Sequence, residues 1–361
     1  MIHSKGQSEF IESVKKGENV FLTGKAGTGK SYIVQQAIKL LNKKSKKTIA
    51  IAPTGIAAQN VGGQTMHSMF GLNVHGVLEW EKIRFLNSQK RLLIKKVEAI
   101  FIDEVSMLRP DHLDAIDLTL KKNGCGKLLD KQVIFVGDMK QLPSPIGDNE
   151  MSVLLEKYDG YTFEKSKVYQ DLKPKEIELN KVHRQNDLEF IENLNIVREG
   201  KKSSYFKQFV GDKTNGVILA PHNTTVKKYN IEGLKKLTSK EITLKALTEG
   251  NAKAFEFNVD DEIKVKDGAK IMYLVNSVDA KELVNGTIGT FKIKGEQYFI
   301  RVNDIDYLLE TKEFTKKEYV FNEEKNKIEL QEIGKITQYT FKLAYALSIH
   351  KSQGLTFEKV T

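Results

Sequence analysis

The first 140 residues carry four short runs of predominantly apolar residues, separated by longer mixed segments. The runs span residues 20–23, 48–52, 99–102 and 132–136. Each run is continuous rather than alternating, which is the pattern of strands buried on both faces of a parallel sheet. Between the first two runs, apolar residues recur at helical spacing over residues 33–41. Strand, helix and strand in this order predict a doubly wound α/β domain over residues 1–165.

The pattern changes along the rest of the chain. Residues 72–90 are polar and basic, contain Trp80, and are expected to form a small insertion in the first domain. A second α/β unit is predicted over residues 166–285 and 339–361, with candidate strands at 176–179, 217–220, 270–273 and 341–349. Several of the runs between these two parts alternate and are separated by polar turns, which predicts an inserted antiparallel β module over residues 286–338. Its expected strands are residues 288–294, 297–302, 305–310, 319–322 and 328–332.

Composition restricts the class of protein. The chain has 361 residues, 40% of them hydrophobic and 29% charged, as in ordinary globular proteins. It has no apolar run of about 18 residues and no signal-peptide core, so we expect no membrane span and a cytoplasmic or other intracellular location. One cysteine, Cys125, excludes an intrachain disulfide. The β module is nearly neutral, so the net charge of +10 belongs to the α/β units. We therefore expect any polyanion to bind to those units.

Residues 24–31, GKAGTGKS, match the phosphate-binding loop GxxxxGK[ST] in full, directly after a predicted strand and before a predicted helix. Glycines in such a loop let backbone N–H groups converge on a β-phosphate. We expect the Lys30 ammonium to bridge the β- and γ-phosphates and the Ser31 hydroxyl to bind Mg²⁺. A glycine-rich turn without a ligand is the structural alternative. The residues expected to hold the nucleotide are Gly24, Ala26, Gly27, Thr28, Gly29, Lys30 and Ser31.

Polar residues follow the two later strands of the same domain. Asp103 and Glu104 end the strand at residues 99–102, where the first is expected to hold Mg²⁺ through water. The second is expected to orient and deprotonate an attacking water, which favours hydrolysis over transfer to a hydroxyl group. Gln141, in the string GDMKQLP, is expected to contact the γ-phosphate and that water. The alternatives are a solvated strand end and a tight turn stabilised by Asp138.

With these motifs, five further strings occur in an order that resembles the superfamily 1 helicases that translocate 5′ to 3′, closest to the petite-integration-frequency (Pif) DNA helicases. The resemblance covers nearly the whole chain. It implies two RecA-like P-loop motor domains with parallel sheets, and a small antiparallel β-barrel-like insertion in the second. The strings are APTGIAA at 52–58, GQTMHSMF at 63–70, VHRQ at 182–185, NG at 285–286 and IHKSQGLT at 349–356.

The resemblance also implies a mechanism and its partners. ATP and Mg²⁺ would bind between the motor domains, and hydrolysis would drive a monomer along single-stranded DNA, splitting duplexes or structured junctions. Arg184 would be the arginine finger that reaches the γ-phosphate from the second motor domain. Gln7 would read adenine, Gly354 would contact the nucleotide, and Trp80 lies in the expected duplex-splitting insertion. The residues implied to bind single-stranded DNA are Pro53, Thr54, His67, Phe70, His350 and Lys351.

Alternatives to these roles stay open at this stage. Gln7 fits a solvated helix start, Arg184 a surface salt bridge, and Phe70 or Trp80 a packed core. In the family, a further strand and a helix with another arginine follow the last string, whereas this chain stops at Thr361, so we expect nucleotide binding with slow hydrolysis. Rival functions are a nucleotide-binding nucleic-acid scaffold without motor activity, an RNA-directed helicase, and a P-loop enzyme acting on a small molecule.

Overall fold

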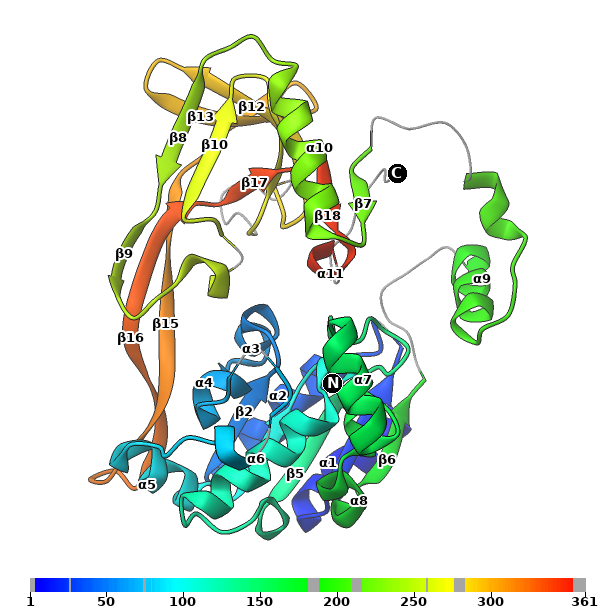
Figure 1. The fold of residues 1–361 in the computed structure, drawn as a ribbon, viewed down its shortest axis with the longest axis vertical. Coiled ribbons are helices and arrows are strands. Elements are labelled where there is room, and N and C mark those ends of the chain that lie inside the picture. The colour runs from blue at the N-terminus through cyan, green and yellow to red at the C-terminus, as the bar shows by residue number, and fades with distance from the viewer. Residues whose placement is uncertain are drawn as a thin grey trace. The chain divides into compact units, whose positions relative to one another are not determined.

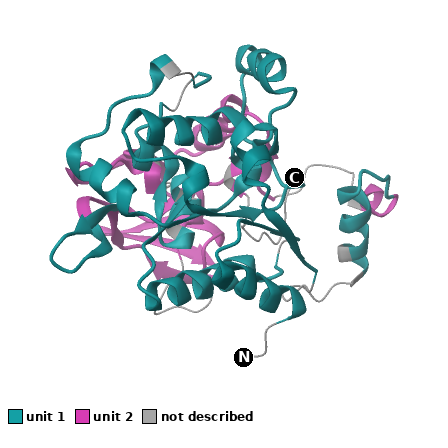
Figure 2. Ribbon diagram, turned by 90° about the horizontal axis from the view of Figure 1, so that it is seen from below, with its two compact units in different colours: residues 1–203, 317–331 teal, residues 204–316, 332–361 magenta. Residues whose placement is uncertain are grey.

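The computed structural model describes residues 4–25, 27–73, 76–78, 80–180, 188–209, 216–257, 259–275 and 283–352. The chain divides into two compact units, coloured separately in Figure 2. The first unit comprises residues 1–203 and 317–331, and the second comprises residues 204–316 and 332–361. The domain boundaries expected near residues 165 and 286 remain predictions.

A six-stranded parallel sheet forms the centre of the first unit (Figure 1). Its pairings include Phe21 opposite Phe135 and Ile49 opposite Ile100. All four strands expected in this domain are confirmed, and β2, β4 and β5 are buried along their whole length, which explains their continuous apolar runs. In spatial order the strands are β3 (Gln64–Thr65), β2 (Thr48–Ala52), β4 (Ala99–Ile102), β5 (Gln132–Gly137), β1 (Val20–Gly24) and β6 (Lys175–Leu179).

The strand β6 corrects one expectation. Residues 176–179 were assigned to the second α/β unit, but they pair in parallel with β1 in the first sheet, with Leu22 opposite Ile177. Only Ile177 and Leu179 of this strand are buried, which is the alternating pattern of an edge strand. Alternation shows that one face of a strand is exposed, but it does not show which sheet the strand joins.

Helices cover both faces of the sheet. Successive residues of β1 pack into two different hydrophobic clusters. Phe21 packs with residues of α4, α5 and α6, whereas Val20 and Leu22 pack with residues of α1 and α2. The helix expected over residues 33–41 is confirmed, with Ile33 and Leu41 buried. The helices are α1 (Lys5–Lys16), α2 (Lys30–Lys43), α3 (Gly55–Val61), α4 (Met66–Phe70), α5 (Ser88–Lys96), α6 (Pro110–Lys122), α7 (Asp148–Tyr158), α8 (Lys167–Leu172) and α9 (Leu188–Arg198).

The second unit is mostly antiparallel where the structure describes it. A five-stranded sheet has the order β14–β13–β12–β11–β17, and β8 (Glu241–Lys245) pairs with β10 (Glu262–Lys266). The parallel pairing in the described part of this unit joins β7 (Ile218–Ala220) to β18 (Ala346–Ser348), beside α10 (Asn223–Lys235) and α11 (Ile349–Ser352). The five-stranded sheet consists of β11 (Lys270–Tyr273), β12 (Ile288–Lys294), β13 (Gln297–Val302), β14 (Ile305–Leu308) and β17 (Phe341–Leu343).

Most strands expected in this part of the chain are confirmed, but three expectations change. The one strand expected at 341–349 is two strands in different sheets, β17 in the five-stranded sheet and β18 beside β7. Residues 270–273 were expected in an α/β unit, yet β11 pairs antiparallel with both β12 and β17. The two short runs at 319–322 and 328–332 belong to much longer strands, β15 (Thr311–Asn322) and β16 (Lys327–Tyr339), which pair with each other and with β9 (Leu247–Gly250). Their extra length consists largely of polar residues, and the apolar pattern does not mark it.

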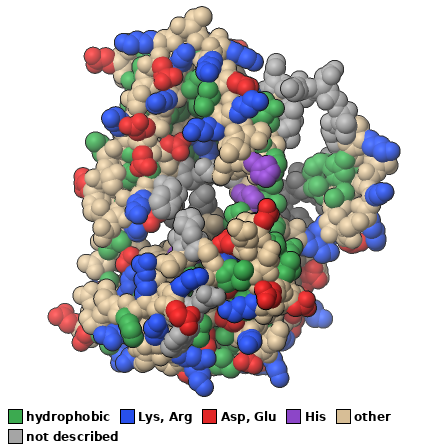
Figure 3. All heavy atoms as spheres, in the orientation of Figure 1, with side chains coloured by type: hydrophobic (Ala, Val, Ile, Leu, Met, Phe, Trp, Pro, Cys, Tyr) green, Lys and Arg blue, Asp and Glu red, His purple; other side chains and the backbone are tan. Residues whose placement is uncertain are grey.

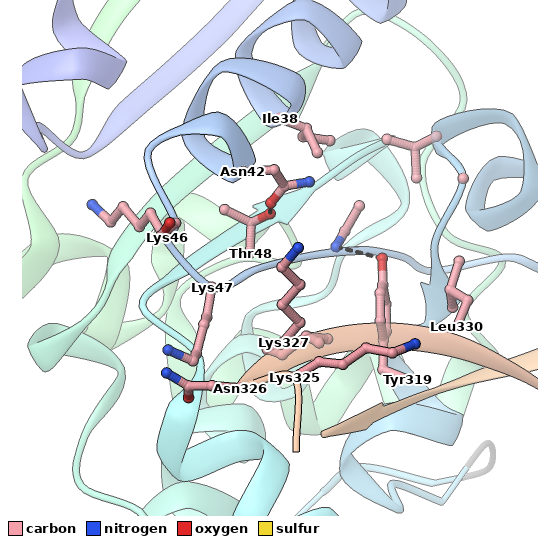
Figure 4. A pocket seen from close by; sticks show the side chains of 15 residues that line it. Ile38, Asn42, Lys46, Lys47, Thr48, Tyr319, Lys325, Asn326, Lys327 and Leu330 are labelled. Carbon is pink, nitrogen blue, oxygen red and sulfur yellow. Dashed lines mark hydrogen bonds between the residues drawn. The ribbon is translucent and has the colours of Figure 1, made fainter. Parts of the chain in front are cut away.

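The tip of the β15–β16 hairpin, residues 317–331, belongs to the first unit. There the backbone N–H of Ala50 donates to the Tyr319 hydroxyl at 3.1 Å (Figure 4). The N–H of Tyr319 donates to Gln64 Oε1 at 3.1 Å. The Ser68 hydroxyl donates to the Glu318 carboxylate at 2.9 Å. The tip also bounds a cavity of about 470 Å³ at the amino end of β2, whose lining includes Lys46, Lys47, Lys325 and Lys327.

Candidate active site

The loop between β1 and α2 has the backbone conformation of an anion-binding turn. Gly24 has φ of 151°, and a Cβ there would lie 2.6 Å from the Leu179 carbonyl oxygen, so no larger residue fits. Gly29 is the N-cap of α2 in the left-handed conformation, with φ of 83°. The N–H groups that begin α2 therefore have no intrahelical partners and present the positive end of the helix dipole to the loop.

The Lys30 ammonium lies inside this loop. Its Nζ donates to the Gly24 carbonyl at 2.7 Å and to the Lys25 carbonyl at 3.1 Å. Burial lowers the pKa of Lys30, while the charges of Asp138, Glu104 and Asp103 oppose that shift. A phosphate group that replaced the two carbonyls would give the ammonium a charged partner in the same place.

Two more expected nucleotide residues lie at this loop, and a third lies beside it. The Thr28 hydroxyl donates to the Lys25 carbonyl at 2.9 Å, and Ser31 is exposed in the first turn of α2. Gln7 is buried in α1, where its side chain and that of Ser4 form a capping box. A Cβ on Gly29 would lie 3.1 Å from Gln7 Nε2, so the Gln7 amide lies against the loop.

Asp103 and Glu104 lie at the carboxyl end of β4, the edge of the parallel sheet that also carries the loop after β1. The backbone N–H of Glu104 donates to Asp103 Oδ1 at 2.9 Å. Glu104 has φ of 51° and ψ of 47°, a left-handed conformation that costs a non-glycine residue about 1–3 kcal/mol. Burial raises the pKa of both carboxyls, and the Lys30 charge lowers it. A carboxylate with a raised pKa is a stronger base, as proton abstraction from water requires.

The turn after β5 brings Gln141 to the same edge of the sheet. The N–H of Gln141 donates to the Asp138 carbonyl at 2.9 Å, and its Nε2 lies 3.4 Å from Asp138 Oδ2. Arg198, the last residue of α9, donates from Nη1 and Nη2 to the two oxygens of Asp138, each at 2.6 Å. Sequence reasoning missed Arg198, because a single arginine at a helix end has no local pattern that shows its partner 60 residues away.

The residues expected to bind DNA have different environments in the first unit. Thr54 is half-buried, and its hydroxyl accepts from the Ala57 N–H at 3.3 Å, while Pro53 lies half-buried just before α3. His67 is half-buried, with its ring 5.2 Å from that of His112. Burial, followed by the Arg109 charge, lowers the pKa of His67, so the ring is neutral. Its Nε2 has no hydrogen-bond partner among the residues described.

The expectation that Phe70 stacks on a DNA base is wrong in this structure. Its side chain is 1% exposed and packs in the core with Met66 and Met69. The helix α4 has only five residues, and its apolar side chains all face the sheet, so the ring has no access to a ligand. We therefore remove Phe70 from the candidate DNA-binding residues.

Several expected site residues cannot be placed. Ala26, Arg184 and Gly354 lie outside the described residues, as do the side chains of Trp80 and Lys351. The backbone of Trp80 begins a short 3-10 helix at Trp80–Lys82. His350 lies half-buried in α11 of the second unit, directly after β18.

Backbone N–H groups of the insertion at residues 72–90 donate hydrogen bonds to side chains of α6 and of the residue that follows it. The Leu78 N–H donates to Asp111 Oδ2 at 2.9 Å, and the Leu86 N–H donates to Asn123 Oδ1 at 2.8 Å. Phe85 lies between these anchored positions with its ring 72% exposed and the Lys122 ammonium 5.5 Å from its centroid. Sequence reasoning missed Phe85, because a single aromatic residue in a polar segment has no local pattern that shows whether it is exposed.

The donor set at the loop fits a magnesium ion. Mg²⁺ takes oxygen ligands, keeps several waters, and is usually bound by one or two carboxylates together with substrate phosphates. The exposed Ser31 hydroxyl and the Asp103 carboxylate lie at the same edge of the parallel sheet and supply such oxygens. Within the described part of the chain, no group of three or more His, Cys, Asp or Glu residues is placed to hold a metal ion by itself.

Two features of the molecule as a whole bear on its class. In Figure 3, basic and acidic side chains are interspersed over the face shown, so the net charge of +10 does not gather in one patch there. None of the helices that the structure describes has the length and apolar character needed to cross a bilayer.

Comparison with known proteins gives one consistent family. The PIF1-like helicase family matches residues 4–223. The ATP-dependent DNA helicase Pif1 of Campylobacter jejuni is 29% identical, over 97% of this chain and 84% of its own. The crystal structure of Bacteroides sp. Pif1 in complex with ADP-AlF4 has a TM-score of 0.83 and 31% identity, and the alignment covers 100% of this chain and 86% of that one. Bacteroides Pif1 bound to single-stranded DNA has a TM-score of 0.66 at 31% identity, covering 100% of this chain and 85% of that one.

Proposed function

Because this chain belongs to the PIF1-like helicase family, we propose that it is an ATP-dependent DNA helicase that moves 5′ to 3′ on single-stranded DNA and unwinds duplexes or structured junctions. The observation that carries the proposal is a complete phosphate loop at the same sheet edge as the Asp103–Glu104 pair and Gln141. A triphosphatase needs an anion cradle, a metal-binding carboxylate and a base for water, and these residues supply all three.

Each residue then has a task in hydrolysis. Lys30 leaves the two loop carbonyls and binds the phosphates, and Ser31 with Asp103 would hold Mg²⁺. When bound, that ion supplies positive charge against the phosphate oxygens. Glu104 accepts the proton of the attacking water, and Gln141 orients that water against the γ-phosphate. Gln7 contacts the base of the nucleotide, and Arg184 completes the charge stabilisation.

Single-stranded DNA is the proposed track. We assign its binding to Pro53, Thr54 and His67 in the first unit, and to His350 and Lys351 in the second. The ssDNA complex of Bacteroides Pif1 supports DNA as the polymer. The exposed Phe85 on the anchored insertion at 72–90 supports that segment as the surface that splits the duplex. We propose a monomer that acts inside the cell, where ATP and DNA are both present.

Two structural parts of the proposal concern the second unit. We propose a second RecA-like motor domain, supported by the parallel β7–β18 pair beside α10. We also propose that the antiparallel strands from β12 to β16 form the barrel-like insertion. The hairpin of β12 and β13 supports this, because its close antiparallel pairing resembles that of small barrels.

Steady-state ATP hydrolysis, titrated with single-stranded DNA, tests the function. We expect single-stranded DNA to stimulate ATP hydrolysis by the wild-type chain. The Lys30→Ala variant should lose hydrolysis, because the ATP phosphates then have no ammonium partner. Lys39→Ala is the matched control, since Lys39 is exposed on the same helix. ATP and DNA binding without any hydrolysis would contradict the motor and support the scaffold alternative. Stimulation by RNA alone would redirect the assignment to RNA.

A further inference from the structure

A buried carboxylate beside the phosphate loop has no task in the hydrolysis described above. Asp138 is 2% exposed, at the carboxyl end of β5. It directly follows Gly137, which pairs with Thr23 at the end of β1, so it lies beside the start of the phosphate loop, and its charge opposes the lowering of the Lys30 pKa by burial. An ionised carboxylate there competes with the nucleotide for Lys30 and repels the γ-phosphate.

Arg198 holds this carboxylate. The guanidinium donates two parallel hydrogen bonds of 2.6 Å to Asp138, with the Arg198 side chain 20% exposed. Although burial raises the pKa of Asp138, the hydrogen bonds from Arg198 and from the Lys140 N–H bring it below its ordinary value, so Asp138 is ionised and paired. The two residues therefore contribute no net charge beside Lys30.

The hydrogen bonds of Arg198 place the end of α9 at the turn after β5. Asp138 begins that turn, and its Oδ1 also accepts from the Lys140 N–H at 3.1 Å. The same turn carries Gln141, so the helix end lies by a segment that would contact the triphosphate.

We propose that Arg198 is a positioning residue for ATP, which neutralises Asp138 and so removes the opposing charge of that carboxylate from the Lys30 ammonium and the γ-phosphate position. The same two hydrogen bonds fix the Asp138 side chain, against which the Gln141 turn is built. The inference rests on the proposed function, because it assumes a triphosphate at residues 24–31. Arg198 acts through Asp138 and does not touch the nucleotide.

The test is a double-mutant cycle read by ATP affinity, using calorimetry with a non-hydrolysable ATP analogue on the full chain, and by kcat and KM. We expect Arg198→Ala to weaken binding by about tenfold or more, because it leaves an unpaired buried charge near the phosphates. In the Arg198→Ala/Asp138→Asn variant both charges are gone, and we expect affinity to return to within about threefold of wild type. Arg198→Lys keeps the positive charge but cannot donate two parallel hydrogen bonds to Asp138. Its affinity for the analogue should therefore lie between those of Arg198→Ala and wild type.

Controls separate the possible failures. Lys201→Ala changes an exposed residue three positions along and should bind the analogue like wild type. If Arg198→Ala binds like wild type, or if the double variant binds as weakly as Arg198→Ala, the positioning role is wrong. A double variant that binds as weakly as Arg198→Ala would mean that Arg198 contacts the nucleotide itself or only supports the fold. If Lys30→Ala binds the analogue like wild type, the proposed nucleotide site fails instead.

Discussion

Lys30 has an environment that is typical of a phosphate-binding lysine. It is half-buried, is hydrogen-bonded to two carbonyls of its own loop, and lies in the field of three carboxylates. Glu104 is held in a left-handed backbone conformation at the end of a buried strand. Strain of this kind persists only where surrounding structure fixes it, and it is common at functional sites. One edge of the sheet therefore carries the candidate base Glu104, the Lys30 ammonium and the loop that would bind the phosphates.

Glu104→Gln tests the base directly. The amide keeps the size of the side chain but accepts no proton, so we expect kcat for ATP to fall at least about 100-fold. Affinity for a non-hydrolysable analogue should stay within about threefold of wild type, because Lys30 and the loop remain. Phosphate release and calorimetry measure the two effects. Glu12→Gln, an exposed residue of α1, is the control, and a Glu104→Gln enzyme with wild-type kcat would remove Glu104 from the mechanism.

The pH dependence of kcat/KM tests the role of Glu104 as the base in a second way. Burial, followed by the Asp103 charge, raises the pKa of Glu104 above that of an ordinary glutamate. A general base works only when ionised, so kcat/KM should rise with pH through this raised pKa and be lost as the pH falls below it. The acidic limb should therefore lie at higher pH than an ordinary glutamate would give.

At the scale of elements, the β15–β16 hairpin tip is the least expected feature of the first unit. It packs Tyr319, Phe321 and Ile328 against the main hydrophobic core and hydrogen-bonds to the buried strand β2. The strand β2 leads directly into Pro53 and Thr54, and Gln64, which accepts from Tyr319, begins the segment that carries His67. The tip therefore supports the backbone of two candidate DNA-binding segments.

Tyr319→Phe tests this contact. The substitution removes the hydroxyl that accepts from the buried Ala50 N–H, and an unsatisfied buried donor costs about 1–3 kcal/mol. We expect the free energy of unfolding of the first unit to fall by that amount in urea denaturation. Tyr161→Phe changes an exposed ring and should leave stability unaltered. Equal stability of Tyr319→Phe and wild type would show that the tip does not bind β2 in solution.

At the scale of the whole molecule, family membership joins the two units into one proposed motor. The PIF1-like match ends at residue 223, whereas the Bacteroides Pif1 structures align with all of this chain. The proposal assigns residues of both units to the same DNA strand, so in the proposed motor directional movement needs both units.

Duplexes with a single-stranded tail on one side test that property. We expect ATP-dependent unwinding of a duplex with a 5′ tail and little unwinding of one with a 3′ tail, because the proposed motor moves 5′ to 3′. Strand separation is followed by fluorescence, with Lys30→Ala as the inactive control. A preference for the 3′ tail would reverse the proposed polarity.

The sequence by itself determined the elements whose signals are local. Strands buried on both faces produce continuous apolar runs, and the phosphate loop is defined by glycines and a lysine at fixed spacing, so β1, β2, β4, β5 and residues 24–31 were predictable. The proposed roles of Glu104 as base and Asp103 as metal-binding carboxylate also rest on their position at a strand end.

Only the tertiary structure decided which distant groups meet. It placed β6 in the first sheet, buried Phe70 in the core, and brought Arg198 to Asp138. An edge strand, a lone aromatic residue and a single arginine each have the same local pattern in several environments. Their partners are fixed by packing and by the pairing of buried charges across the fold, which depend on contacts between residues far apart in the chain.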